Sequence, residues 1–176
     1  MLKRFKLYLN EMLMPTHVMT FMRANPPTAG HETVVNKVLD VAKKTGGSHS
    51  VILSHSQDPK KNPLPPSQKL KHAKKAFPNA NVEVASDEMP TLLHHAVRYH
   101  QQGVKNLHVV VGQDRVQQFK DLLDKYNGVE KPHGYYKFNN ITVHSAGNRD
   151  PDAEGLEGIS GTKMRQAANS GDRETF

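Results

Sequence analysis

A short segment near the start of the chain combines residue types that suit a phosphate site: Asn25-Pro26-Pro27-Thr28-Ala29-Gly30-His31. Its two prolines oppose a helix before Thr28, and Thr28 is a natural N-cap for a helix that follows at once. Gly30 lets a ligand approach the backbone, and His31 lies in the first turn, where N–H groups and the helix dipole attract an anion. The segment predicts a phosphate site beside an imidazole. A capped helix with a chance histidine fits the segment alone about equally well.

A second segment with related chemistry lies near the end of the chain: Ile159-Ser160-Gly161-Thr162-Lys163-Met164-Arg165. Its serine can cap a helix, and the glycine and threonine after it would present N–H groups and a hydroxyl at the helix start. Lys163 and Arg165 add two cations within one turn, and a forked guanidinium suits phosphate oxygens. Alone, such a segment is most often a capped, basic surface helix. Two anion sites on two helix starts in one domain are much harder to explain in that way.

Strand-like and helix-like segments alternate between these two motifs. The expected strands are residues 17–23, 50–54, 81–85, 106–111 and 141–145, and the expected helices are residues 28–44, 67–77, 90–102, 115–126 and 160–169. Such alternation predicts a Rossmann-like, doubly wound α/β sheet of about five parallel strands with helices on both faces. In such sheets, ligands bind at the carboxyl ends of the strands, near the switch in strand order.

Composition limits the class of protein. The 176 residues fit one domain, and the absence of cysteine excludes disulfides, cysteine nucleophiles and cysteine-based zinc sites. No apolar run is long enough for a membrane span, and residues 1–14 lack a signal-peptide pattern, so we expect a soluble, cytoplasmic protein. The net charge of +7 favours anionic partners, either nucleic acid or small phosphorylated ligands, and cannot choose between them.

Together, the two motifs resemble the signatures of the nucleotidylyltransferase superfamily, Thr/His-x-Gly-His and Ile-Ser-x-Thr-x-x-Arg. This superfamily includes adenylyltransferases that act on nicotinamide mononucleotide or phosphopantetheine, and cytidylyltransferases that act on glycerol phosphate or choline phosphate. Residues 110–115, Val-Val-Gly-Gln-Asp-Arg, are similar to the Gly-x-Asp segment that members carry beside the nucleoside. Residues 54–66 and 145–158 look most like the corresponding parts of cytidylyltransferase-like proteins of large tailed phages. A protein encoded by such a phage would be expected in the host cytoplasm. We therefore expect residues 1–15 to be an N-terminal extension and residues 16–176 a nucleotidylyltransferase-like domain.

The resemblance implies transfer of a nucleotidyl group from an NTP, CTP or ATP, to a phosphorylated small molecule, with release of pyrophosphate. The implied catalytic residues are Thr28, His31 and Arg165. The implied nucleotide-binding residues are Arg23, Asn25, Pro26, Gly30, Gly112, Asp114, Ile159, Ser160, Gly161 and Thr162. Mg²⁺, or another divalent cation, would be held mainly by substrate phosphates, so no dedicated metal ligands are expected.

The acceptor is expected in the loop after the second strand, at Ser54, His55, Lys60 and Lys61. A phosphorylated acceptor needs cations there, although a solvated lysine pair is an equally good interpretation. A second group of lysines, Lys69, Lys71, Lys74 and Lys75, is expected to form a solvated helix face. The spacing of His94, His95 and His100 does not favour a metal site.

Two other functions stay open. A degenerate enzyme that binds a nucleotide without turnover is suggested by Met22, which stands where many members have glycine, and by Ala24. A nucleic-acid-binding protein is suggested by the net charge, but the sequence lacks the basic and aromatic interleaving of a stacking platform. A homo-oligomer is compatible with the sequence, and a membrane partner is not expected.

Overall fold

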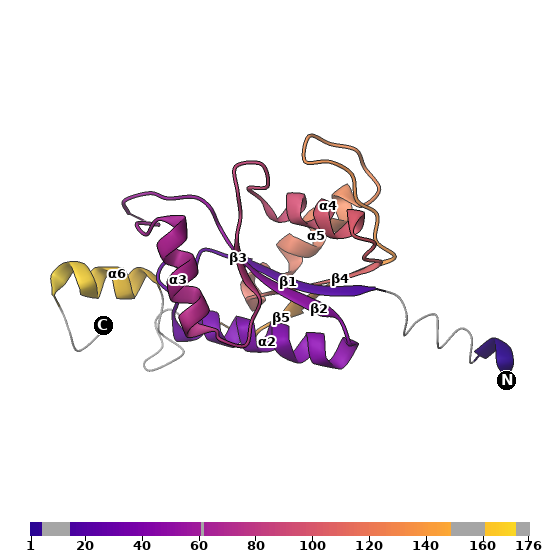
Figure 1. Cartoon of the computed structure of the whole chain (residues 1–176), viewed down its shortest axis with the longest axis horizontal. Helices are drawn as coiled ribbons and strands as arrows, with labels where there is room; N and C mark the ends of the chain where they lie inside the picture. The colour runs from indigo at the N-terminus through magenta and orange to yellow at the C-terminus, as the bar shows by residue number, and fades with distance from the viewer. Residues whose placement is uncertain (5–14, 61, 149–160, 172–176) are drawn as a thin grey trace.

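The computed structural model describes residues 1–4, 15–60, 62–148 and 161–171. Five strands form one sheet in the order β3-β2-β1-β4-β5 (Figure 1). Their bounds are β1 Thr16–Met22, β2 Ser48–Leu53, β3 Val82–Val84, β4 Asn106–Val111 and β5 Asn140–Ser145. Every neighbouring pair is parallel, which confirms the predicted α/β sheet. The strand order switches beside β1, so the fold points to the carboxyl ends of β1 and β4 as the ligand-binding edge.

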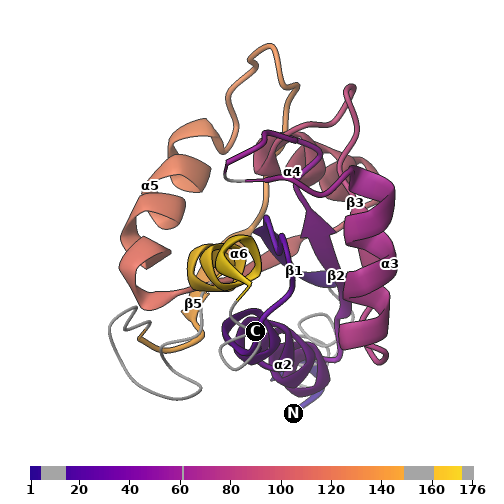
Figure 2. The same cartoon turned by 90° about the vertical axis from the view of Figure 1, so that its left-hand side faces the viewer.

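Helices cover both faces of this sheet. Their bounds are α2 Ala29–Thr45, α3 Pro66–Ala76, α4 Leu92–Gln101, the 3₁₀ helix η1 Gln113–Arg115, α5 Val116–Tyr126 and α6 Gly161–Ser170. The helices α2 and α3 pack on one face, and α4 and α5 pack on the other. Figure 2 shows α6 end-on in front of the sheet, with α2 below it and α3 and α5 to either side. Among the described residues, no helix is long and apolar enough to cross a membrane.

Burial on both faces fixes the position of β1. Val18 is fully buried against Val38 of α2, and Met19 is fully buried in the cluster on the opposite face. Burying a side chain of this size contributes about 1.5–3 kcal/mol. The alternation of these residues therefore holds β1 in the centre of the sheet, and with it the segment that leaves its carboxyl end.

A buried polar network crosses the α4 face near the start of β1. The two ring nitrogens of His17 are hydrogen-bonded to the hydroxyls of Ser48, at 2.7 Å, and Ser50, at 2.8 Å. The ring also stacks on Tyr99 of α4, with 3.8 Å between the ring centroids. These contacts connect β1 and β2 to α4 through polar side-chain atoms, within a layer that is otherwise packed by apolar side chains.

Two histidines near this network are held neutral by burial. His17 is 5% exposed, and His95 of α4 is 1% exposed, with its Nδ1 atom 3.9 Å from a carboxylate oxygen of Glu83. Burial is the main cause that lowers the pKa of each ring to about 4, and the neighbouring Arg98 lowers it further. Both rings therefore stay uncharged in the folded protein at neutral pH.

This neutrality predicts a loss of stability at mildly acidic pH. Between about pH 6.5 and about pH 4 the unfolded chain protonates these rings and the folded chain does not, so the free energy of unfolding falls as pH falls. Together, the two rings should lower the free energy of unfolding by about 4 kcal/mol when the pH falls from about 7 to about 5. Urea denaturation at the two pH values measures this. We expect His95→Leu to lose less stability than the wild type, and the exposed control His72→Gln to lose as much; an equal loss in all three proteins would contradict the assignment.

Candidate functional site

The start of α2 orients His31. Thr28 is the extended N-cap residue, and its backbone N–H donates to the Nδ1 atom of His31 at 3.1 Å. The Thr28 hydroxyl oxygen lies 2.8 Å from the same nitrogen. A ring nitrogen that accepts an N–H bond carries no proton, so the proton of the neutral imidazole is on Nε2. Thr28 therefore sets both the orientation of the ring and its ability to donate.

Asn25 connects the first motif to the loop between β2 and α3. The side chain is 2% exposed, and its amide donates to the side-chain oxygen of Asn62 and to the carbonyl of Leu64. Its side-chain oxygen accepts the Leu64 N–H at 3.1 Å. Since the carboxamide is used within the protein, it positions this part of the site.

Arg165 brings the last helix to the first motif. Its guanidinium donates to the backbone carbonyl of Asn25 from 140 residues away along the chain. Burial lowers the pKa of Arg165; the nearby Asp58 opposes that shift and Arg23 adds to it. Arg23 and Arg165 are therefore close enough to repel each other, and an anion bound beside them would relieve that repulsion.

Lys69 corrects the expectation of a fully solvated lysine face on α3. It is 0% exposed, and its ammonium group donates to the carbonyls of Ser54 and Ser56 and to the side-chain oxygen of Asn62. Burial and the nearby Arg23 lower its pKa. Lys69 and the buried Ala73 are four positions apart, so helical spacing places both on the inner face. This spacing is the signal in the sequence that indicates burial of Lys69. Lysines 71, 74 and 75 are exposed, as expected.

The residues expected at the acceptor separate into different environments. Ser54 is 8% exposed, and its hydroxyl lies 3.4 Å from the ammonium group of Lys69. His55 pairs with Asp87, with 3.3 Å between Nδ1 and the carboxylate. Lys60 is exposed and lines a cavity, while Lys61 lies outside the described residues. Lys60 is thus the only one of the four that the described structure places on that cavity wall.

Gly112 and Asp114 follow the carboxyl end of β4, an interior strand next to β1. A Cβ atom built on Gly112 would lie 2.9 Å from the Asp114 carboxylate, so this carboxylate folds back over the glycine. Ile159 and Ser160 lie outside the described residues, and Gly161 and Thr162 form the first turn of α6. The described residues of the expected nucleotide site therefore follow the carboxyl ends of β1 and β4 or lie in the first turns of α2 and α6.

Met22 and Ala24, the two positions that depart from the pattern of the resembled superfamily, both pack in the apolar interior beside the end of β1. Met22 is partly buried and packs with the apolar cluster of β2, α2 and α3 that includes Leu53. Ala24 is fully buried and has a φ of 43°, in the left-handed region that favours glycine. The structure therefore gives Met22 a packing role.

A cavity of about 890 Å³ opens between the first motif, the loop after β2, α3 and α6. The basic side chains on its wall are Lys60, His72, Lys75 and Arg165. No group of three or more His, Asp or Glu residues that could hold a metal ion occurs in the described part of the chain. The cavity thus presents cations from three separate segments.

Comparison with known protein families gives a match over most of the chain. The family described as Cytidylyltransferase-like matches residues 22–167, which run from the last residue of β1 into α6. The matched range includes both motifs and Gly112. No curated protein matches the chain.

The buried position of Lys69 generates a testable prediction. Lys69→Met should leave the Ser54 and Ser56 carbonyls unpaired and cost about 2–4 kcal/mol of stability. The loop should also open more often, so trypsin should cut faster after Lys60 and Lys61. Urea denaturation and timed trypsin digestion measure the two effects, with the exposed Lys71→Met as control. Unchanged stability and cleavage in Lys69→Met would show that this lysine does not hold the loop.

Proposed function

Because the chain belongs to the cytidylyltransferase-like family, we propose that it transfers a nucleotidyl group from an NTP, CTP or ATP, to a phosphorylated small molecule. The observation that carries the proposal is the bond from Arg165 to the Asn25 carbonyl, because it joins the two motifs whose residue types suit phosphate. A site of this kind can hold several phosphates of one NTP. The products are the nucleotidylated acceptor and pyrophosphate.

The reaction needs position and charge stabilisation from the protein. An oxygen of the acceptor's phosphate attacks the α-phosphorus, the bond from that phosphorus to the bridging oxygen of the β-phosphate breaks, and pyrophosphate leaves with that electron pair. The Nε2–H group of His31 would donate to an α-phosphate oxygen as charge builds there, with Thr28 holding the ring. Arg165 and Arg23 would stabilise the charge on the leaving pyrophosphate.

The remaining parts of the substrate would bind at the same edge of the sheet. The ribose or base would contact Gly112 and Asp114 at the end of β4. Mg²⁺, bound mainly to phosphate oxygens and water, would neutralise charge on the NTP, which suits a cation that keeps much of its hydration shell. The acceptor would enter from the side of Lys60.

A pyrophosphate-release screen tests the activity directly. Each of the four NTPs is combined with a panel of phosphorylated acceptors, and released pyrophosphate is measured with magnesium present. Release with at least one pair is the expected result. NTP binding without release for any acceptor would favour the alternative of a nucleotide-binding module, which Met22 and Ala24 suggest.

Substitution of His31 should separate catalysis from binding. An imidazole that meets the α-phosphate mainly as charge builds lowers the energy of the transition state more than that of the bound NTP. His31→Ala should therefore reduce kcat roughly 10²–10³-fold with NTP affinity nearly unchanged. Arg165→Ala should weaken NTP binding as well, because its phosphates are already charged in the ground state. Near-normal kcat in His31→Ala would mean that this residue only caps a helix.

Gly112→Ala should reveal the role of Asp114. The added methyl group would displace the carboxylate, a flexible group that can rotate away, so we expect stability to change by less than about 0.5 kcal/mol. NTP affinity should fall in Gly112→Ala and in Asp114→Asn alike. Calorimetric titration with NTP and thermal unfolding of both variants make the comparison, and normal affinity in both would remove Asp114 from the nucleotide site.

A further inference from the structure

The ammonium group of Lys69 is used entirely within the protein. It donates to the carbonyls of Ser54 and Ser56 and to the side-chain oxygen of Asn62, the last at 3.2 Å. An ammonium group has three N–H donors, so these three acceptors match its full capacity. No ion pair among the described residues includes Lys69, and its side chain is fully buried. This lysine therefore cannot contact a substrate, and its effect on one must pass through its neighbours.

Asn62 connects this buried lysine to the first motif. Its side-chain oxygen accepts hydrogen bonds from Lys69 and from the amide group of Asn25. Its own amide group donates to the Ser56 hydroxyl at 2.9 Å and to the carbonyl of the same residue. Asn25 and Asn62 are both buried, so water does not replace a partner that either of them loses. The three polar side chains of Lys69, Asn62 and Asn25 thus form one connected chain of hydrogen bonds.

Two routes lead from Asn62 to Arg165. The first runs through Asn25, whose backbone carbonyl accepts the guanidinium. In the second, the backbone of Asn62 pairs in both directions with that of Asp58, with N–O distances of 2.9 and 3.1 Å. The Asp58 carboxylate acts on Arg165, because it opposes the lowering of the Arg165 pKa by burial. A shift of Asn62 would therefore move both the hydrogen-bond acceptor and the acidic neighbour of Arg165.

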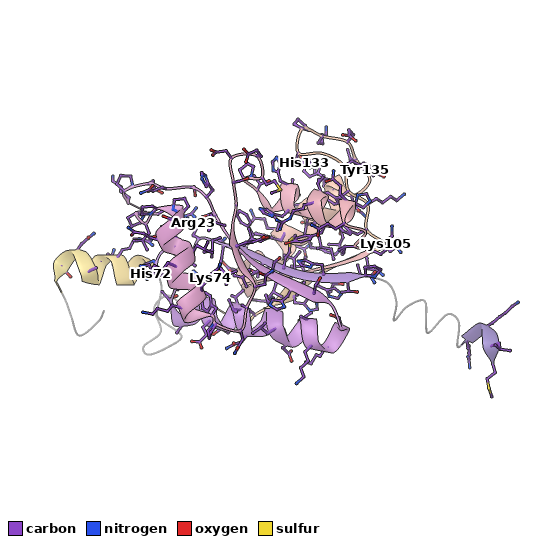
Figure 3. All side chains as sticks on the ribbon, viewed as in Figure 1. Arg23, His72, Lys74, Lys105, His133 and Tyr135 are labelled. Carbon is purple, nitrogen blue, oxygen red and sulfur yellow. The ribbon has the colours of Figure 1, made fainter. Side chains whose placement is uncertain are left out.

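Arg165, unlike Lys69, is within reach of a ligand, because it lines the cavity at the first motif. Arg23 is close to both cations, since its charge lowers the pKa of each. Figure 3 shows Arg23 beside α3, the helix that carries Lys69. Repulsion from Arg23 favours displacement of the Arg165 guanidinium, and the fixed positions of Asn25 and Asp58 oppose it. The network behind Asn62 therefore restrains the cation that can meet a phosphate.

We propose that Lys69 is a positioning residue for NTP binding, which acts on the nucleotide through Arg165. It fixes Asn62, and Asn62 fixes the Asn25 carbonyl and the Asp58 carboxylate on which the guanidinium depends. The proposal rests on the proposed function, which assigns Arg165 to the phosphates that leave as pyrophosphate. Holding the loop alone would give Lys69 an effect on stability. The proposal adds an effect on NTP affinity that exists only while Arg165 is present.

A double-mutant cycle in NTP affinity tests this dependence. Calorimetric titration with magnesium and ATP, and separately with CTP, is applied to the wild type, Lys69→Met, Arg165→Ala and the variant with both substitutions. Circular dichroism sets a temperature at which all four are folded. We expect Lys69→Met to weaken binding of the preferred nucleotide about tenfold, and Arg165→Ala to weaken it at least as much. The double variant should bind no more weakly than Arg165→Ala, whereas a lysine that only stabilises the fold would weaken binding by the same factor in both backgrounds.

Matched substitutions show whether the coupling is specific. Lys74→Met removes the same charge from an exposed position of α3, and its NTP affinity should stay within about twofold of that of the wild type. Asp114→Asn changes the proposed nucleotide site at the end of β4, so its effect should multiply with that of Lys69→Met. If Lys69→Met does not fold, Asn62→Ser takes its place in the cycle, because it breaks the same connection with the lysine retained.

Two results would overturn this inference alone. Unchanged affinity in Lys69→Met, or an equal loss with and without Arg165, would show that this lysine does not act through the guanidinium. An equally large loss in Lys74→Met would indicate general attraction of the charged nucleotide. Neither result affects the proposed function, which stands while the wild type releases pyrophosphate. A wild type that binds neither ATP nor CTP would reject the proposed function, and this inference with it.

Discussion

The site depends on how Asn25 is held. Its carboxamide bonds to Asn62 and Leu64, and its backbone carbonyl accepts the guanidinium of Arg165. The residue thus joins the end of β1, the loop after β2 and the last helix at one point. Lys69 stabilises the same set of contacts, because its buried ammonium group donates a hydrogen bond to the side-chain oxygen of Asn62. This set of polar contacts positions the proposed phosphate-binding groups, which are distant along the chain.

These contacts bring like charges together. Arg23 lies within electrostatic reach of both Lys69 and Arg165, and burial adds to the cost of keeping those two charged. Hydrogen bonds to backbone carbonyls stabilise Lys69, and Asp58 supplies negative charge near Arg165. In the proposed site, a bound phosphate would further reduce the repulsion among these cations, which the fold already holds in place.

Much of the fold could be predicted from the sequence because apolar periodicity records which residues are buried. The run from Leu107 to Val111 predicts an interior strand, and Thr28 with His31 predicts a capped helix start. The residue type of Lys69 predicts exposure to solvent, whereas its helical spacing from Ala73 indicates the burial that the structure shows. The contact from Arg165 to Asn25, the network of His17 with Tyr99, and the cavity wall on α3 depend on tertiary packing. No local pattern contains that information.

Following the α-phosphate shows whether the two motifs form one site for nucleotidyl transfer. The protein is incubated with NTP labelled at the α-phosphate, magnesium and an extract of phosphorylated small molecules, and the products are separated. If the two motifs form such a site, the α label enters a new compound and a parallel γ label appears in pyrophosphate. Transfer of the γ label to an acceptor, or bound NTP that is never consumed, would show that they do not.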